Sequence, residues 1–353
     1  MFCPALLGMV GNFPSVVACS SDPATAATQL QSYLRCNPFD WVIVADEELL
    51  RALIDGRSLD SRTEWFPVDP ADSLAVDLLA SKYTFIERAD ALGLSVPTNR
   101  FAASADEAVA YAQEIGYPVF LKGEHGFAGL QVRCLTDDQG VRRVAERFLQ
   151  AYSRVLVQGR IGGIPVSACV LYDRGKLSAY KTFMTECEYP GRFSPSTVHQ
   201  YFAHPAIEPV LSALGEATKF HGLAGVDFMY DPALDKLFVI EMNPRPTIGF
   251  AGAAANRAFF APAIERFLRR GSFSAPDVYD GREPAQCYFP SYLFYLATRP
   301  DWHDRRLLDR LRASIHEFRP REWRLVLFEI VRFFGGRLKK AATVVLSHRK
   351  RRR

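Results

Sequence analysis

The sequence predicts an α/β protein of two or three domains, and two observations support this. Short apolar segments typical of buried strands alternate with segments of helical periodicity along most of the chain. The 353 residues are 48% hydrophobic and 23% charged, as in globular proteins that bury a core without cross-links. The seven cysteines are scattered, and none forms a Cys-x-x-Cys pair, so we expect reduced thiols and a cytoplasmic protein.

Residues 1–72 predict a reduced N-terminal α/β domain. Ala24–Leu34 and Asp46–Ile54 have helical patterns, and Phe39–Ala45 between them is interpreted as a single buried strand. A polar, proline-containing stretch then predicts a boundary before Ser73. We expect neither a signal peptide nor a membrane-spanning helix, because a basic leading segment and a run of 18 apolar residues are both missing.

Residues 73–272 predict a second and larger domain. One helix is expected over Ser73–Leu92, and another over Ala105–Ile115 with Ser104 as its N-cap and Glu107 three residues later. Further helices are expected at Val141–Ala151 and Glu208–His221, strands at Tyr117–Lys122, Leu130–Leu135, Val155–Gln158, Pro165–Tyr172, Gly225–Tyr230 and Leu237–Asn243, and a loop at Gly191–Tyr201.

The strongest chemical signal is the hairpin predicted near the end of this domain. Glu241 and Asn243 are two residues apart on a strand, so their side chains share a face. If Asp231 opposes Leu237, the hairpin has a five-residue loop and Asp227 lies directly opposite Glu241. Two carboxylates and an amide on one surface are oxygen ligands of the kind that Mg²⁺ prefers.

A cation follows this ligand set, because Arg245 comes two residues after Asn243 and could hold a carboxylate or a phosphoryl group. Spacing alone leaves open a surface hairpin with solvated charges. The sequence Glu-Met-Asn-Pro-Arg-Pro at residues 241–246, however, closely resembles the metal-binding signature of the ATP-grasp superfamily. That superfamily includes biotin carboxylase, carbamoyl-phosphate synthetase and D-alanine–D-alanine ligase, and the resemblance runs from about Ser73 to Leu268.

The resemblance implies a fold, a pair of cofactors and a reaction. In an ATP-grasp fold two α+β subdomains hold ATP between them, here after the reduced α/β domain. The implied cofactors are ATP and one or two Mg²⁺ ions, with Mn²⁺ as a substitute, held by Asp227, Glu241 and Asn243. A small carboxylate would attack the γ-phosphate, and an amine or another nucleophile would then displace phosphate, with Arg245 and Lys122 as catalytic residues.

Further positions match the nucleotide-binding residues of the family. A lysine at the end of a strand and the glycines after it can contact phosphates, and a later strand and the backbone beyond it can hold adenine. The matched residues are Lys82, Lys122, Gly126, Gly129, Gln158 and Ile161. Taken singly, each also fits a turn, a buried strand or a solvated lysine. The sequence departs from the family at Gly123, where proline is frequent, and at Phe127, where small residues are usual.

Two groups of residues near the hairpin could contact substrate. His199, Gln200 and His204 precede the helix that leads into it, and Asn256 and Arg257 follow it after an alanine-rich stretch. Ordinary structural roles fit these residues as well.

Residues 273–353 predict a helical C-terminal extension with a basic tail. Twelve Lys or Arg and two acids lie between Arg319 and Arg353, although the net charge of the whole chain is only +4. The rest of the chain is therefore acidic, and we expect the tail to meet an anionic membrane surface and not nucleic acid. This would place the protein at the inner face of the membrane. A helix packed on the body is the alternative.

Two other functions stay open at this point. The chain could be a degenerate ATP-binding module without catalysis, or a peripheral membrane protein in which the ATP-grasp core is secondary. The sequence names neither the carboxylate nor the nucleophile, and it leaves the oligomeric state open.

Overall fold

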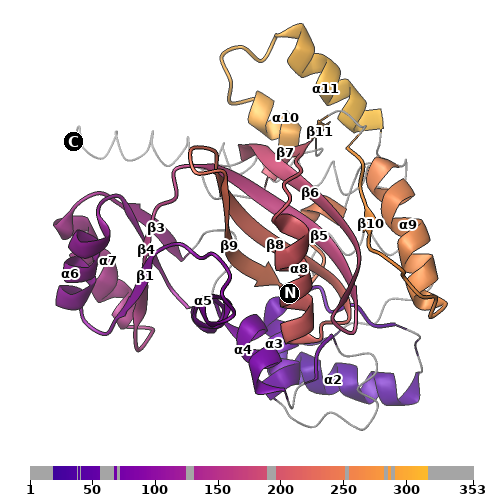
Figure 1. Ribbon diagram of the computed structural model, residues 1–353, viewed down its shortest axis with the longest axis horizontal. Helices are drawn as coiled ribbons and strands as arrows, with labels where there is room; N and C mark the ends of the chain where they lie inside the picture. Colours follow the sequence, from indigo (N-terminus) through magenta and orange to yellow (C-terminus); the bar gives the residue numbers. More distant parts are fainter. Residues whose placement is uncertain are drawn as a thin grey trace, which may run out of the picture.

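The computed structural model describes residues 19–37, 39, 41–55, 67–69, 72–124, 131–188, 196–250, 254–281, 285–287 and 291–316. Within these ranges the chain forms a small sheet and a large sheet, each with helices packed against it (Figure 1). The described N-terminal helices lie beside the large sheet, and α5 lies between the two sheets. The predicted α/β class is confirmed.

The N-terminal part is helical in the residues described. The helices are α2 (Pro23–Cys36), α3 (Glu47–Asp55), α4 (Ser73–Ala80) and α5 (Lys82–Ala91). The strand expected over residues 39–45 is wrong, because residues 41–45 are not part of a strand. Apolar side chains of this segment pack against other elements without forming a strand. Val44 is part of the core of the large sheet, and the ring centroids of Trp41 and Phe267 are 5.1 Å apart.

The single helix expected over residues 73–92 is two helices. Ser81 interrupts it in an extended conformation, with φ −150° and ψ 155°. Its hydroxyl accepts hydrogen bonds from the backbone N–H groups of Tyr83 and Thr84, so Ser81 is the N-cap of α5. The break places Lys82 at the first position of the second helix.

The small sheet has the strand order β1-β4-β2-β3. Its strands are β1 (Asn99–Ala102), β2 (Val119–Lys122), β3 (Val132–Leu135) and β4 (Val155–Gly159), and its helices are α6 (Ala105–Ile115) and α7 (Asp138–Leu149). Both helices pack on one face, where Leu121 and Val157 share a core with Val144 and Phe148. The predicted cap of α6 is confirmed, since the N–H of Glu107 donates to Ser104 Oγ at 3.1 Å.

The large sheet has the order β11-β7-β6-β5-β8-β9, and β10 pairs with β6. The strands are β5 (Ile164–Asp173), β6 (Lys176–Glu188), β7 (Ser196–Tyr201), β8 (Gly222–Asp231), β9 (Lys236–Asn243), β10 (Asp277–Val278) and β11 (Gln286–Cys287). The expected loop at residues 191–201 is wrong in its second half, which is β7. β6 is not predicted from the sequence, because buried Ser178, Lys181 and Thr182 interrupt its apolar pattern.

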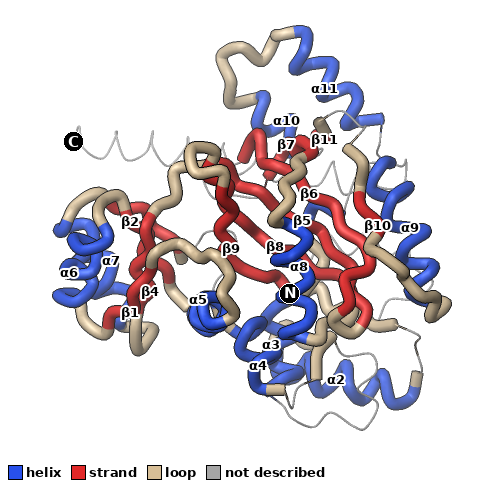
Figure 2. The backbone as a smooth tube through the Cα atoms, viewed as in Figure 1, coloured by secondary structure: helices blue, strands red, loops and turns tan. Residues whose placement is uncertain are grey.

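Helices cover both faces of the large sheet (Figure 2). On one face α8 (Ile207–Thr218) packs with α3 and α4 over an apolar core. On the other, α9 (Ala254–Leu268) packs through Phe260 and Phe267, after a short 3₁₀ turn at Ile248–Phe250. This second face also carries the acids of the predicted metal site.

The C-terminal part described here contains α10 (Ser291–Leu296) and α11 (Arg305–His316). Both lie at the β7 and β11 edge of the large sheet (Figure 1). The basic tail at residues 319–353 lies outside the described residues. Among the helices that are described, none has the length and apolarity needed to cross a bilayer.

Candidate active site

The β8–β9 hairpin brings the predicted metal ligands together. Asp227 lies opposite Glu241, as predicted from the sequence. The turn is shorter than predicted, however, because Asp231 pairs with Lys236 and not with Leu237. A bulge at Ile240 takes up the extra residue and restores the predicted register at the acids.

Asp227 is held in one orientation by two donors. Its Oδ1 accepts from Ser167 Oγ on β5 at 2.6 Å, and its Oδ2 accepts from Asn243 Nδ2 at 3.0 Å. Burial and the neighbouring carboxylate of Glu241 raise the pKa of Asp227 to about 6, although both hydrogen bonds act to lower it. Two adjacent, half-buried carboxylates favour a cation between them, so the residues present fit a magnesium ion.

The protein's own contribution to such a site is two carboxylates and one amide. No cluster of three or more His, Cys, Asp or Glu side chains with metal-binding geometry occurs in the part of the chain that the structure describes. Mg²⁺ in nucleotide sites is commonly bound through one or two carboxylates together with phosphate oxygens and water. Asp227, Glu241 and Asn243 match that pattern.

Two lysines from other elements approach Glu241. Lys82 Nζ, at the start of α5, lies 3.2 Å from Glu241 Oε2. Burial lowers the pKa of Lys122 on β2 to about 8, with Lys82 adding to the shift and Glu241 opposing it. Burial acts to raise the pKa of Glu241, but Lys82 and Lys122 outweigh it and hold that pKa below its ordinary value. Acids from one sheet and lysines from outside it therefore form one charged site.

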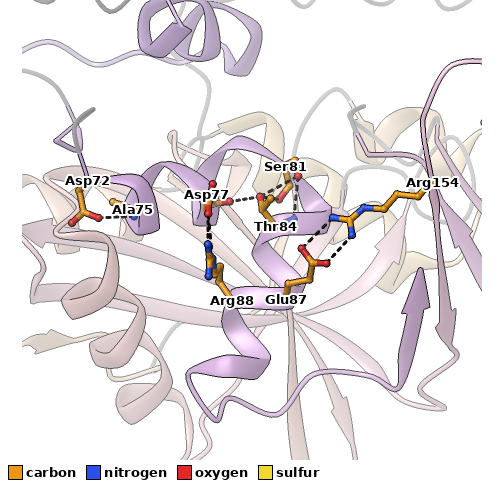
Figure 3. Close-up of polar contacts among 8 residues, drawn as sticks. All are labelled: Asp72, Ala75, Asp77, Ser81, Thr84, Glu87, Arg88 and Arg154. Atoms are coloured by element: carbon orange, nitrogen blue, oxygen red, sulfur yellow. Dashed lines mark hydrogen bonds and ion pairs between the residues drawn. The ribbon is translucent and has the colours of Figure 1, made fainter. Parts of the chain in front are cut away.

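Polar contacts hold the α4–α5 junction together (Figure 3), and Lys82 is the first residue of α5. The hydroxyl of Thr84 donates to the backbone oxygen of Asp77, and Arg88 pairs with the Asp77 carboxylate at 2.7 Å. Both terminal guanidinium nitrogens of Arg154 donate to the carboxylate of Glu87 on α5, at 2.9 and 3.1 Å. Arg154 lies directly before β4, so this pair ties α5 to the small sheet.

The small sheet presents its nucleotide-binding candidates on the face away from α6 and α7. Lys122 is in register with Leu156, and Phe120 with Gln158, so Lys122 and Gln158 point to the same side. Gln158 is 2% exposed, and its Nε2 has no hydrogen-bond partner among the described residues. Ile161 lies in the segment between β4 and β5, and its backbone makes no hydrogen bond to another described residue.

Arg245 is held by an acid from the N-terminal helices. Its Nε and one terminal nitrogen lie 2.8 and 2.7 Å from Glu47 Oε1 on α3. Nearby, the side chain of Thr247 occupies the space that a Cβ on Gly225 would need, which lets the segment after Asn243 lie close against β8. The arginine therefore stays beside the acids as predicted.

The remaining predicted residues either lie outside the described residues or are not part of this cluster. Gly126, Gly129 and the side chain of Arg257 are outside the described residues. His199 is buried and stacked on Phe183, with ring centroids 3.6 Å apart, and burial together with Lys181 lowers its pKa well below the ordinary value. The remaining three have separate surroundings: Gln200 is exposed, His204 lies 3.3 Å from Asp235 in the hairpin turn, and Asn256 accepts from Lys181.

Sequence reasoning missed three residues with polar roles here. Ser167 is the only hydroxyl residue in the otherwise apolar segment 164–171, a signal that could have been used. Lys181 is 3% exposed and donates to Gln286 at 2.7 Å, and nothing in the sequence marks it as buried. Glu47 meets Arg245 across 198 positions of sequence, a contact that only the fold reveals.

Comparison with known proteins agrees with this geometry. Residues 79–249 match the family model described as an ATP-grasp domain. The C-terminal section of the carbamoyl phosphate synthase large chain from Methanopyrus kandleri is 27% identical over 231 residues. That match covers 61% of this chain and 41% of the relative, so the chain spans about two fifths of the relative's length.

Solved structures share the fold at low sequence identity. The biotin carboxylase domain of 2-oxoglutarate carboxylase from Hydrogenobacter thermophilus, in complex with MgADP and bicarbonate, has a TM-score of 0.60 at 16% identity, covering 76% of this chain and 63% of that one. N5-carboxyaminoimidazole synthetase from Staphylococcus aureus, with ADP, has a TM-score of 0.59 at 15% identity, covering 78% and 71%. The chain contains an ATP-grasp domain, and it carries the acids, the asparagine and the lysines of the predicted site in one place.

Proposed function

We propose that this protein is an ATP- and magnesium-dependent ligase that activates a small carboxylate for attack by an amine or a similar nucleophile. One observation carries the proposal: Asp227 and Glu241 face each other on the hairpin with Asn243 beside them, and Lys82 and Lys122 approach from other elements. Acids for a metal and cations for phosphates thus meet at one point between the two sheets. The similarity to ligases and carboxylases with ATP-grasp domains supports the same function.

ATP would lie between the two sheets. Lys122 and Lys82 would bind phosphate oxygens, and Lys82 would exchange its contact with Glu241 for them. The buried amide of Gln158 and the backbone of Ile161 have hydrogen-bonding capacity that the described residues do not use, which suits the polar edge of adenine. The glycines at 126 and 129 would cover the triphosphate, as the sequence resemblance implies.

The reaction would proceed in two steps. A carboxylate oxygen of the substrate attacks the γ-phosphorus, the bond to the β–γ bridging oxygen breaks, and ADP leaves. The nucleophile then attacks the acyl carbon, phosphate departs, and the nucleophile loses a proton. Mg²⁺ bound by Asp227, Glu241 and Asn243 would neutralise charge on the transferred phosphoryl group. Arg245, oriented by Glu47, would stabilise the same charge from the other side.

The nucleotide product tests the reaction class. Full-length protein is incubated with MgATP and a mixed pool of carboxylates and amines, and the spent nucleotide is separated by chromatography. We expect ADP and phosphate in equal amounts, dependent on the pool. AMP with pyrophosphate would contradict the proposal, since it would indicate adenylation. MgATP binding without any turnover would favour the alternative, a degenerate ATP-binding module.

The basic tail supports a second, independent candidate, which is association with anionic membranes. Five consecutive basic residues at 349–353 would each add about 1 kcal/mol near a charged surface. We expect the full chain to sediment with anionic but not with neutral vesicles, and less so at higher salt. Replacing residues 349–353 by glutamine should weaken that binding. If the variant sediments with anionic vesicles as the wild type does, these residues do not mediate membrane binding.

A further inference from the structure

A small cavity lies between α3 and the metal hairpin. Its lining includes Glu47 and Arg51 from α3, Lys82 from α5, and Glu241 with Asn243 from β9. The volume is about 40 Å³, whereas one water molecule needs about 10–15 Å³ of this kind of space. The cavity therefore has room for the charged end of a ligand, with any larger group outside it.

Arg51 brings a cation to this cavity that no described acid pairs with. Among the described residues, its buried Nε has no hydrogen-bond partner and its guanidinium forms no ion pair. A buried donor without an acceptor is unfavourable, so an acceptor is expected from a ligand. Carboxylates match the planar fork of a guanidinium with two parallel hydrogen bonds. Arg51 is thus suited to a carboxylate.

Glu47 adds the opposite charge one helical turn earlier. Residues four apart on a helix are neighbours on one face, and both Glu47 and Arg51 line the cavity. The contacts of Glu47 with Arg245 use only its Oε1. No described residue bonds its Oε2, and a carboxylate can accept at both oxygens. An ammonium group could therefore bind there.

The backbone that carries this pair is rigidly placed. Leu50 and Leu53 lie between and beyond the two residues on α3, and both are buried in the core of the large sheet, at 2% and 0% exposure. The helix is thereby fixed relative to the hairpin with the metal-binding acids. Binding groups on such an element are pre-organised, which lowers the cost of ordering them around a ligand.

We propose that Glu47 and Arg51 form a subsite for a zwitterion, in which Arg51 binds the carboxylate and Glu47 the ammonium group of an α-amino acid. The inference rests on the proposed function in one respect: the carboxylate held at Arg51 would be the one that is activated. Glu47 would also keep the amino group of this substrate protonated. A protonated amine has no lone pair, so the nucleophile of the second step would be a different molecule.

Saturation-transfer difference NMR tests the subsite without knowledge of the reaction. The full-length protein is mixed with the twenty common L-amino acids, with and without Mg²⁺ and a non-hydrolysable ATP analogue. We expect at least one amino acid to receive saturation. Arg51→Gln should weaken its binding at least tenfold, and Glu47→Gln should weaken it as well. Arg100→Gln, which removes a guanidinium paired with Glu114 on the small sheet, is the matched control and should leave it unchanged.

Derivatives of the bound amino acid separate its two charges. The N-acetyl form lacks the ammonium group and the amide form lacks the carboxylate, so neither should compete at tenfold excess. Competition by the N-acetyl form would show that the site recognises only the carboxylate, and it would refute the proposed recognition of a zwitterion. The subsite is also refuted if no amino acid binds the wild type, or if binding survives Arg51→Gln.

Calorimetry with the MgATP analogue alone keeps this test apart from the proposed function. Loss of nucleotide binding in folded Arg51→Gln would make Arg51 a phosphate ligand and would refute the subsite. Failure of the wild type to bind the analogue would instead refute the proposed function, while the amino-acid titration without nucleotide would still decide the subsite.

Discussion

The two faces of the large sheet use the same strands for different purposes. Toward α8 the strands present an apolar surface, with Val166, Val170, Val226 and Phe228 in one core. Toward α9 the alternate residues include Leu171 and Phe183, which pack on that helix. Beside this patch lie the polar side chains of Ser167, Asp227 and Lys181, which bond one another or neighbouring elements. Neighbouring residues such as Asp227 and Phe228 thus serve opposite faces.

This difference places the predicted chemistry on only one face of the sheet. The apolar face gains free energy by removing side chains from water. The polar face carries a cost instead, since the pKa of Asp227 is raised by burial and by Glu241. A group whose pKa is raised in the folded state gives stability only at low pH and loses it as the pH rises through about 6. At neutral pH ionised Asp227 therefore lowers the stability of the folded state, and binding of a cation would remove this unfavourable contribution.

The largest effect is expected from breaking the polar face. Asp227→Asn and Glu241→Gln should each reduce magnesium-dependent ADP formation at least 1000-fold, because each removes a carboxylate from a site that has two. The unfolding midpoint of Asp227→Asn should equal or exceed that of the wild type at pH 7. Glu216→Gln, an exposed acid on α8, is the matched control and should alter neither. Near wild-type turnover in a folded variant would show that the substituted acid is not a ligand of the metal.

The apolar face should respond in the opposite way. Phe228 is 2% exposed, so Phe228→Ala should lower the free energy of unfolding by about 3–5 kcal/mol. Affinity of the remaining folded protein for MgATP should change less than threefold. Chemical denaturation and calorimetry measure the two quantities. Phe39→Ala, at a residue that is 53% exposed, should cost less than about 0.5 kcal/mol. An equal loss at both positions would show that burial in the core beneath α8 is not the source of the stability that Phe228 provides.

A smaller effect is expected from pH at Lys122, which faces the polar side from the small sheet. Its pKa of about 8 means that the ammonium form, which attracts phosphate, is lost as the pH rises through 8. The affinity for MgATP should therefore fall about tenfold between pH 7 and pH 9. In Lys122→Arg the side chain stays charged, so calorimetry should give a flat profile. A wild-type profile that is equally flat would contradict this role of Lys122.

The smallest effect is expected at the α4–α5 junction, which belongs to neither face. Arg88 and Asp77 form an ion pair with side chains that are 49% and 32% exposed. Such surface pairs contribute about 0–1 kcal/mol, so Arg88→Gln should change the unfolding free energy by less than that. Turnover should stay within about twofold. A drop beyond tenfold in a folded variant would show that the junction controls Lys82 more tightly than its exposed contacts suggest.

The sequence was most informative where chemistry and local pattern coincide. The spacing of Glu241 and Asn243 on one strand predicted their shared face, and the pairing of Asp227 with Glu241 is confirmed. The bulge at Ile240 was not predictable, because the register of a hairpin depends on how the turn and the core are satisfied together. The predicted pairing of Asp227 with Glu241 still holds, because the turn is one residue shorter than predicted and the bulge adds one residue to β9.

The missed elements share a physical cause. β6 has Ser178, Lys181 and Thr182 among its buried residues, and a sequence pattern treats polar residues as exposed. The segment at residues 39–45 has the apolar composition of a strand, but Trp41 and Val44 pack against other elements instead. The pair of Arg245 and Glu47 joins residues 198 positions apart, and no local rule connects them.

The most direct test of the central claim is electron paramagnetic resonance with Mn²⁺ in place of Mg²⁺. The claim is that Asp227, Glu241 and Asn243 on the polar face of the sheet bind the metal that accompanies ATP. We predict that full-length protein binds Mn²⁺ tightly only when ATP is present, and that this bound signal is lost in Asp227→Asn and Glu241→Gln but retained in Glu216→Gln. Equal ATP-dependent Mn²⁺ binding by the wild type and folded Asp227→Asn and Glu241→Gln would contradict the claim.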